Sequence, residues 1–267
     1  MPAPLRAFLE HALPVLRQHP ALVGVAAGGS FAAGRMDQFS DLDLVVVAHP
    51  SAGPGVLDQR RAIAASLGPL LASFTGEHVG EPHLLICLYG QPLAHVDLKF
   101  VIPADLRMRV EEPVLLWDRD GSVAAALAEG HAVYPLPDMQ WIEDRFWVWV
   151  HYGATKIGRG ELLEACDFLA FLRTQVLGPL ALQHAGARPT GVRRLEEHAL
   201  QHGEALRGTV ATPDHDDCRR ALQAAIALYR ELRTVLAPAG LELRTAAEQA
   251  AMAYLDALPA GVTAVPP

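Results

Sequence analysis

Two aspartates, Asp41 and Asp43, and a Gly28-Gly29-Ser30 turn separated from them by ten residues have the types and spacing best suited to chemistry. Residues 42–48 favour a strand, and alternate side chains of a strand point to one face, which places the two carboxylates side by side. Like charges held that close repel each other, and a divalent cation relieves the repulsion. Mg²⁺ takes carboxylate oxygens together with substrate phosphates, and the N–H groups of a glycine turn suit an anion. The unit therefore predicts nucleotide chemistry.

The same residues also allow a purely structural interpretation. The aspartates could solvate a strand end, and Gly28-Gly29 could form an ordinary turn. Aspartate is disfavoured in strands, however, whereas the Leu-Val-Val-Val run around Asp43 is strongly strand-like. The motif in this setting favours a binding site over a solvated strand end.

The motif resembles the signature of the DNA polymerase β-type nucleotidyltransferase superfamily, with Gly29-Ser30, a ten-residue gap and Asp41-x-Asp43 between apolar residues. Within that superfamily the chain is most similar to the small bacterial antibiotic nucleotidyltransferases, the aminoglycoside and lincosamide adenylyltransferase type. The motif covers only about residues 22–48. The resemblance implies that Asp41 and Asp43 hold Mg²⁺, while Ser30 and the backbone of Gly28 and Gly29 hold the outer phosphates of ATP or another NTP.

A third carboxylate is expected in this superfamily on a later, half-buried strand. Residues 93–102 alternate between polar and apolar side chains, which predicts such a strand. His95, Asp97 and Lys99 fall on the polar face. Asp97 is therefore the candidate for the third acid, either as a metal ligand or as the general base on the acceptor hydroxyl. The alternative is a solvent-facing strand with a chance Asp-Lys pair.

The segment 75–83 is a glycine-flanked loop that holds two acids and two histidines ahead of an apolar strand. Loops of this kind are as often solvated hairpins as substrate-facing segments. Glu77 and Glu81 are secondary candidates for contact with a cationic acceptor.

The composition limits the classes of protein to which the chain can belong. The chain has 267 residues with 51% hydrophobic and 19% charged side chains, and 22 basic against 30 acidic residues leave a net charge of −8. An acidic chain with no long Lys/Arg run is not expected to bind nucleic acid. The three cysteines lack metal-site spacing and suit free thiols in a reducing cytoplasm. We expect no signal peptide and no membrane span.

The hydrophobic periodicity and the positions of Gly and Pro between the periodic segments predict an α+β architecture with two domains. A mixed-sheet nucleotidyltransferase domain is expected over residues 1–134, and an α-helical bundle over 135–267 that closes the active-site cleft. The expected strands of the first domain are residues 22–27, 42–48, 84–88, 93–102 and 113–117, with helices at 4–18, 56–71 and 122–129. The expected helices of the second are 138–158, 161–184, 191–205, 213–236 and 243–258.

The first helix of the second domain holds three of the four tryptophans and ends near Lys156. An aromatic-rich helix followed by Lys, Arg and Glu at this spacing resembles the aminoglycoside 6-adenylyltransferase group, which implies that Lys156 faces the triphosphate and Glu161 begins the next helix. Most of the aromatics are expected to pack in a helix core. A lysine at a helix C-terminus is also favoured by the dipole alone.

The predicted activity is a Mg²⁺-dependent nucleotidyltransferase that moves AMP from ATP to a hydroxyl of a small acceptor, with an aminoglycoside-like antibiotic as one candidate. One alternative is nucleotidylation of a protein side chain. Another is a catalytically silent nucleotide-binding module, although binding alone would not require three acids. The sequence leaves the acceptor, the base preference and the oligomeric state open.

Overall fold

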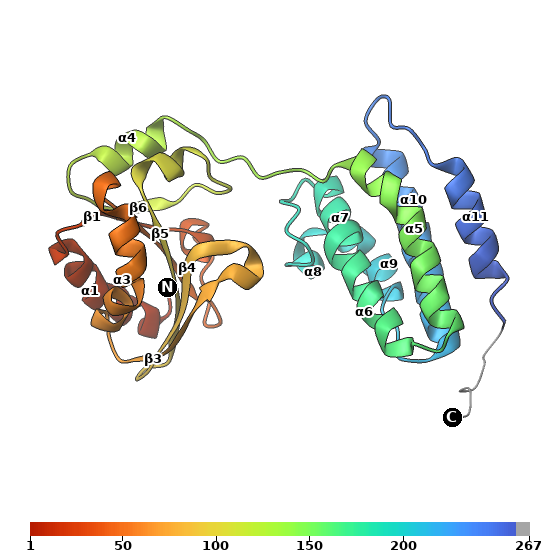
Figure 1. Cartoon of the computed structure of the whole chain (residues 1–267), viewed down its shortest axis with the longest axis horizontal. Coiled ribbons are helices and arrows are strands. Elements are labelled where there is room, and N and C mark those ends of the chain that lie inside the picture. The colour runs from red at the N-terminus through yellow and green to blue at the C-terminus, as the bar shows by residue number, and fades with distance from the viewer. Residues whose placement is uncertain (260–267) are drawn as a thin grey trace. The chain divides into compact units, whose positions relative to one another are not determined.

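The computed structural model describes residues 1–259, which form two compact units, one of residues 1–134 and one that begins at Pro135 (Figure 1). The first contains a six-stranded sheet with helices, and the described part of the second is helical. The predicted α+β class, with a mixed sheet followed by a helical bundle, is confirmed.

The sheet has the strand order β3-β4-β5-β2-β1-β6. The β2–β5 pair is parallel and the other four pairs are antiparallel, which makes the sheet mixed as predicted. The strands are β1 (Leu22–Ala27), β2 (Leu42–Ala48), β3 (Leu70–Gly76), β4 (Glu81–Tyr89), β5 (Ala94–Val101) and β6 (Val114–Asp118). The helices of this unit are α1 (Ala3–Gln18), α2 (Gly29–Ala32), α3 (Gly53–Ser66) and α4 (Ser122–Ala128), with 3-10 turns η1 (Pro50–Ala52), η2 (Glu77–Val79) and η3 (Pro103–Arg107).

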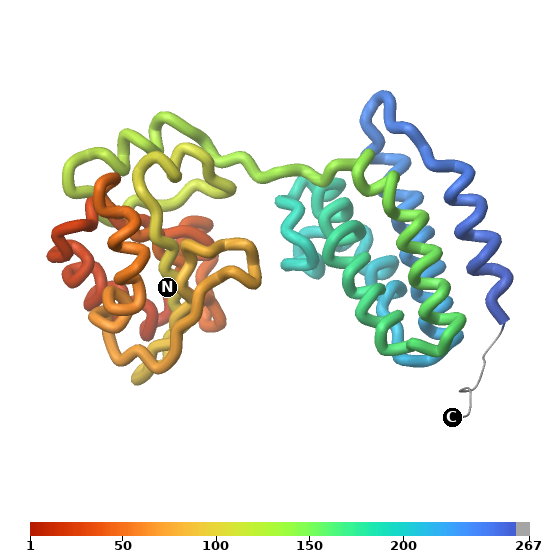
Figure 2. The backbone as a smooth tube through the Cα atoms, in the orientation of Figure 1, coloured from red at the N-terminus to blue at the C-terminus, as the bar shows by residue number. Residues whose placement is uncertain are grey.

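Strand β3 was not predicted, and the expected helix over 56–71 is wrong at its C-terminal end. The helix stops at Ser66, and Gly68, with φ of 153°, and Pro69 turn the chain into β3. β3 then pairs with β4, which begins at Glu81 rather than at residue 84. Figure 2 traces the path of the backbone through this part of the chain. β3 is an edge strand with several exposed residues, so its sequence lacks the clean alternation of a half-buried strand. The backbone hydrogen bonds to β4 are what make this segment a strand.

The two faces of the sheet are covered to different extents, and this difference positions the site. Alternate residues of β2 and β5, among them Leu44 and Leu98, pack into one core with α1 and α3. On the opposite face Val47 and Val101 pack with α4 and η3 in a smaller cluster. That cluster covers only the C-terminal ends of the parallel pair. The N-terminal ends of β2 and β5, which carry the aspartates, lie outside it.

The second unit contains the helices α5 (Met139–Gly158), α6 (Leu162–Leu172), α7 (Gly178–His184), α10 (His215–Leu236) and α11 (Thr245–Asp256). A π-helical turn, Arg173–Leu177, joins α6 to α7. The combined stretch Leu162–His184 is long and apolar enough to cross a membrane by composition, but 61% of the apolar window is buried within the unit. It is therefore a core helix of the bundle.

The predicted helix 191–205 is wrong. The chain forms three short pieces there, α8 (Leu195–His198), η5 (Leu200–His202) and α9 (Gly203–Gly208). Gly191 and Arg194 both have positive φ, at 64° and 56°, and a helix cannot run through such residues. These pieces form one wall of a cavity that is described below.

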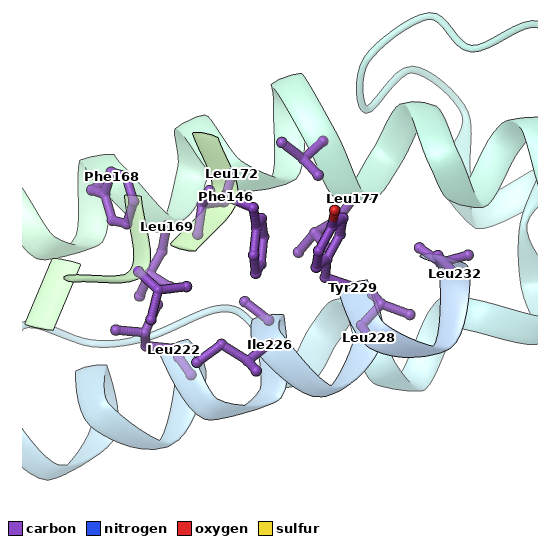
Figure 3. Close-up of a cluster of buried hydrophobic side chains, with 14 of the residues drawn as sticks. Phe146, Phe168, Leu169, Leu172, Leu177, Leu222, Ile226, Leu228, Tyr229 and Leu232 are labelled. Atoms are coloured by element: carbon purple, nitrogen blue, oxygen red, sulfur yellow. The ribbon is translucent and has the colours of Figure 1, made fainter. Parts of the chain in front are cut away.

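The core of the helical unit is built around aromatic side chains from α5 and α10 (Figure 3). The rings of Phe146 and Tyr229 stack with centroids 3.7 Å apart, and Trp147 is 1% exposed. Trp141, by contrast, is 44% exposed. The expected core role therefore holds for Phe146 and Trp147 but not for Trp141.

Candidate active site

The acids predicted from the sequence lie at the uncovered ends of two neighbouring parallel strands. Asp43 of β2 and Asp97 of β5 are register partners, and Asp41 comes directly before β2. Register partners in a parallel pair point to the same face, so the strand pairing places both carboxylates on the polar side of the sheet. One oxygen each from Asp41 and Asp97 and one ring nitrogen of His95 lie within 4.8 Å of one another.

His95 is a site residue that the sequence placed on the right strand face without assigning it a role. Its Nε2 lies 3.1 Å from Oδ1 of Asp97, and the Asp97 side chain is 18% exposed. Burial raises the pKa of Asp97 above its usual value; the proximity of His95 opposes the rise and the charge of Asp41 adds to it. A carboxyl with a raised pKa beside a second carboxylate is stabilised in this position by a bound cation or by a proton.

The glycine turn packs directly against Asp43. The Gly28 N–H donates to the carbonyl of Asp43 at 3.0 Å. Gly29 has φ of 55°, and a Cβ built there would lie 1.9 Å from Oδ2 of Asp43. Only glycine therefore lets the turn approach this carboxylate so closely. The hydroxyl oxygen of Ser30, next in the turn, is buried and has no hydrogen-bond partner among the described residues.

Glu111 is a residue of this site that sequence reasoning missed. The Gly29 N–H, one of the predicted phosphate donors, donates to Oε1 of Glu111 at 2.8 Å across 82 residues of sequence. Arg109 holds the loop that presents Glu111, because its guanidinium donates to the carbonyls of Leu106, Leu127 and Gly130. No local pattern signals such a contact, since it depends on where a distant loop returns to the turn.

The remaining predicted residues have other partners. Lys156 is 14% exposed, and its Nζ lies 2.7 Å from Glu161 and 2.9 Å from Glu164, whose carboxylates raise the pKa of its ammonium. Glu161 is the N-cap residue of α6, as the resemblance implied for the start of the next helix. Glu81 pairs with Lys99 at 2.8 Å. The proposed triphosphate contact of Lys156 stays a prediction.

The donors at the ends of β2 and β5 fit a divalent cation with a phosphate beside it. Two carboxylates supply the hard oxygens that Mg²⁺ prefers, and an imidazole nitrogen in the same group would also suit Mn²⁺. The unpartnered Ser30 hydroxyl and the glycine turn next to Asp43 supply a place for an anion. The arrangement can therefore hold a metal–phosphate group, and Asp97 can accept a proton from a bound hydroxyl.

The similar solved structures include an adenyltransferase and a nucleotidyltransferase-like protein. One is an aminoglycoside 6-adenyltransferase from Bacillus subtilis, with a TM-score of 0.38 and 13% identity over 94% of this chain and 97% of that chain. Another is a nucleotidyltransferase-like protein from Exiguobacterium sibiricum 255-15, with a TM-score of 0.40 and 15% identity over 86% of this chain and 74% of that chain.

No family model and no curated protein matches the chain.

Proposed function

We propose that the chain is a metal-dependent nucleotidyltransferase that transfers a nucleoside monophosphate, AMP from ATP, to a hydroxyl of a small acceptor. The observation that carries the proposal is the register of Asp43 with Asp97 on adjacent parallel strands, with Asp41 and His95 completing the group. These acids gather beside a glycine turn, where a metal ion and a phosphate can bind side by side.

Asp41 and Asp43 would hold the divalent cation, Mg²⁺ in our proposal, as carboxylate ligands, and Asp97 would either complete the metal site or act as the general base. When bound, the cation would neutralise negative charge on the triphosphate and make phosphorus easier to attack. The close contact between Gly29 and Asp43 keeps the turn against the carboxylate, so a phosphate bound by the turn lies next to the metal ligands. Positioning and charge neutralisation of this kind supply most of the catalysis in phosphoryl transfer.

The phosphate contacts would come from the turn. The hydroxyl of Ser30 has no partner among the described residues and can donate to a phosphate oxygen. The Gly29 N–H is bonded to Glu111, so a phosphate that uses this donor must displace the Glu111 carboxylate. Glu111 thus occupies the place of an anion when no nucleotide is bound.

In the role of general base, Asp97 would take the proton of the acceptor hydroxyl. The hydroxyl oxygen forms a bond to the α-phosphorus, the bond between the α-phosphorus and the bridging oxygen breaks, and pyrophosphate leaves. Burial raises the pKa of Asp97, which makes it a better base than an exposed aspartate. His95, bonded to Asp97 Oδ1, orients the carboxylate for this transfer.

The acceptor would be a small molecule, and the net charge of −8 suits a cationic one such as an aminoglycoside. The free thiols of Cys87, Cys166 and Cys218 are compatible with the reducing cytoplasm that we propose as its compartment.

The direct test is incubation of the full chain with labelled ATP, Mg²⁺ or Mn²⁺, and a panel of hydroxylated acceptors. Mass spectrometry should detect an acceptor that has gained a nucleoside monophosphate, together with released pyrophosphate. An Asp41→Asn, Asp43→Asn double variant serves as the control and should form no product. Product formation by that variant at the wild-type rate would refute the assignment of the metal ligands.

A further inference from the structure

A cavity of 440 Å³ lies within the helical unit, at the π turn between α6 and α7. Its other walls come from the segment α8-η5-α9, where the sequence had predicted one continuous helix. A volume of this size falls in the range of small-molecule binding sites. All of the lining residues belong to the helical unit, whereas the acids belong to the sheet unit.

The walls are mainly apolar, and the mouth is open. Leu195 and Leu206 are buried and form part of the interior surface. Val192, Leu200 and Val210 also line the cavity and are 42%, 74% and 54% exposed. Apolar side chains that are this exposed around a hollow are a common mark of a ligand site.

The backbone around the cavity is closely packed. Gly178, which follows the π turn, faces the carbonyl oxygen of Gly191, and a Cβ there would lie 2.3 Å from it. Any larger residue would push the loop away from the turn. π-helical turns often occur at functional sites, and here the turn supplies two of the lining residues, Arg173 and Thr174.

Two arginines line the cavity without a carboxylate partner. The Nη1 of Arg173 donates to the carbonyl of Thr209 at 2.6 Å, and burial lowers the pKa of its guanidinium. Neither Arg173 nor Arg207 forms an ion pair with any acid in residues 1–259. Other arginines of the unit do, since Arg220 pairs with Asp217, and Arg230, Arg233 and Arg244 also have acidic partners. Arg173 is partly buried, so its charge beside an apolar surface is costly unless an anion accompanies it, whereas Arg207 is exposed.

We propose that this cavity binds a small amphipathic monoanion, a carboxylate carried on an aliphatic or aromatic body. The carboxylate meets Arg173 and Arg207, and guanidinium groups bind carboxylates through paired hydrogen bonds. The body lies against Leu195, Leu206 and their apolar neighbours. Glu196 also lines the cavity, and its negative charge selects against ligands with a second anionic group. The inference does not depend on the proposed transfer reaction.

The test uses isothermal titration calorimetry on the full chain with sodium octanoate, and with octanamide and octylamine as neutral and cationic probes of equal chain length. We expect one octanoate per chain. Octanamide should bind roughly tenfold more weakly or worse, because a hydrogen bond to a charged group contributes about 1.5–3 kcal/mol. Octylamine should not bind. Equal affinity for octanoate and octanamide would overturn the charge assignment.

Variants locate the site. Arg207→Met and Arg173→Met should each weaken octanoate roughly tenfold and leave octanamide unchanged, since each removes one charged donor. Arg145→Met, on the exposed side of α5 with its guanidinium over Trp141, is the matched control and should have no effect. Arg207→Met alone decides the question if Arg173→Met does not fold, because the side chain of Arg207 donates no hydrogen bond within residues 1–259.

Ala170→Trp fills the cavity from α6 and should abolish binding of octanoate and octanamide alike. Circular dichroism checks that each variant is folded. Wild-type octanoate affinity in folded Arg207→Met and Ala170→Trp would refute the site. An Asp97→Asn variant should bind octanoate normally, so a failure of the proposed transfer reaction and a failure of this inference are told apart.

Discussion

Acidic side chains are used in opposite ways in the two units. In the helical unit Glu143 is 0% exposed and is surrounded by donors, with Tyr229 OH at 2.6 Å, Arg233 Nη1 at 3.1 Å and the Arg244 N–H at 3.0 Å. In the sheet unit Asp41 and Asp97 gather with His95 as the third member of their group. Glu143 is already paired with the positively charged Arg233. Asp41 and Asp97 instead lie where a cation from solution can bind.

The pKa values reflect this difference. Burial alone would raise the pKa of Glu143, but the hydrogen bonds from Tyr229, Arg244 and Arg233 outweigh it and the pKa is lowered. At Asp97 the burial effect prevails and the pKa is raised. A buried carboxylate with a complete set of hydrogen-bond donors contributes to the stability of the fold. A carboxylate without one is held ready for a ligand or a proton, at some cost to the fold.

The largest expected effect is on catalysis. Asp97→Asn should lower turnover by roughly 10²–10⁴ if Asp97 is the general base, the usual range for acid–base catalysis. The melting temperature should stay the same or rise, because one of two neighbouring negative charges is removed. Product formation by mass spectrometry and thermal unfolding measure the two effects.

The affinity for Mg²⁺-ATP separates the two roles of Asp97. It should be unchanged for a general base and weakened for a metal ligand. A variant with wild-type turnover at every pH between 6 and 9 would remove Asp97 from the site.

The converse is expected of Glu143. Glu143→Gln leaves Arg233 with only Glu248, and breaking a buried pair costs about 3–5 kcal/mol, of which we expect the lower end because Glu248 remains. Turnover per folded molecule should not change. Urea unfolding measures the loss, with Glu242→Gln as the surface control. A large loss of turnover in folded Glu143→Gln would break the distinction between the two kinds of acid.

The turn is expected to be sensitive to any side chain at Gly29. Gly29→Val places a Cβ against Oδ2 of Asp43 and should weaken nucleotide binding roughly tenfold or more, which corresponds to 1.4 kcal/mol or more. Gly34→Val is a matched control, because Gly34 also has positive φ, at 63°, but a Cβ there meets no atom within 4 Å. Calorimetric titration with ATP compares the two. Equal affinities would mean that the turn has only a structural role.

A smaller effect of opposite sign is expected at Glu111. Glu111→Ala removes the acceptor of the Gly29 N–H and should tighten ATP binding about two- to tenfold, the equivalent of a hydrogen bond worth roughly 0.5–1.5 kcal/mol. Glu111→Gln, which keeps an acceptor without the charge, should fall between Glu111→Ala and wild type. Weaker binding in both variants would show that Glu111 assists the nucleotide instead of competing with it.

The smallest expected effect is on the free energy of unfolding at acid pH. The folded pKa of Glu143 lies below its ordinary value of 4.5, so its contribution is fully present above that pH and is lost as the pH falls through the folded value. Unfolding free energy should therefore drop more steeply below pH 4.5 in wild type than in Glu143→Gln. Parallel slopes for the two proteins would contradict the assignment.

The sequence by itself determined the parts that depend on local pattern. The strands β1 and β2, the turn between them and the polar face of β5 follow from alternation and from glycine chemistry over short windows. The long helices α5 and α10 follow from their helical periodicity. These features were predictable because the residues that specify them are close in the chain.

Only the tertiary structure decided the rest. The parallel pairing of β2 with β5 sets Asp43 opposite Asp97 and puts His95 in the group, and no local signal fixes which strands become neighbours. The contact of Glu111 with Gly29 spans 82 residues. β3 has too little pattern of its own to be recognised without β4. In each case the determining interaction joins segments far apart in sequence, so its partner and geometry arise when the chain packs.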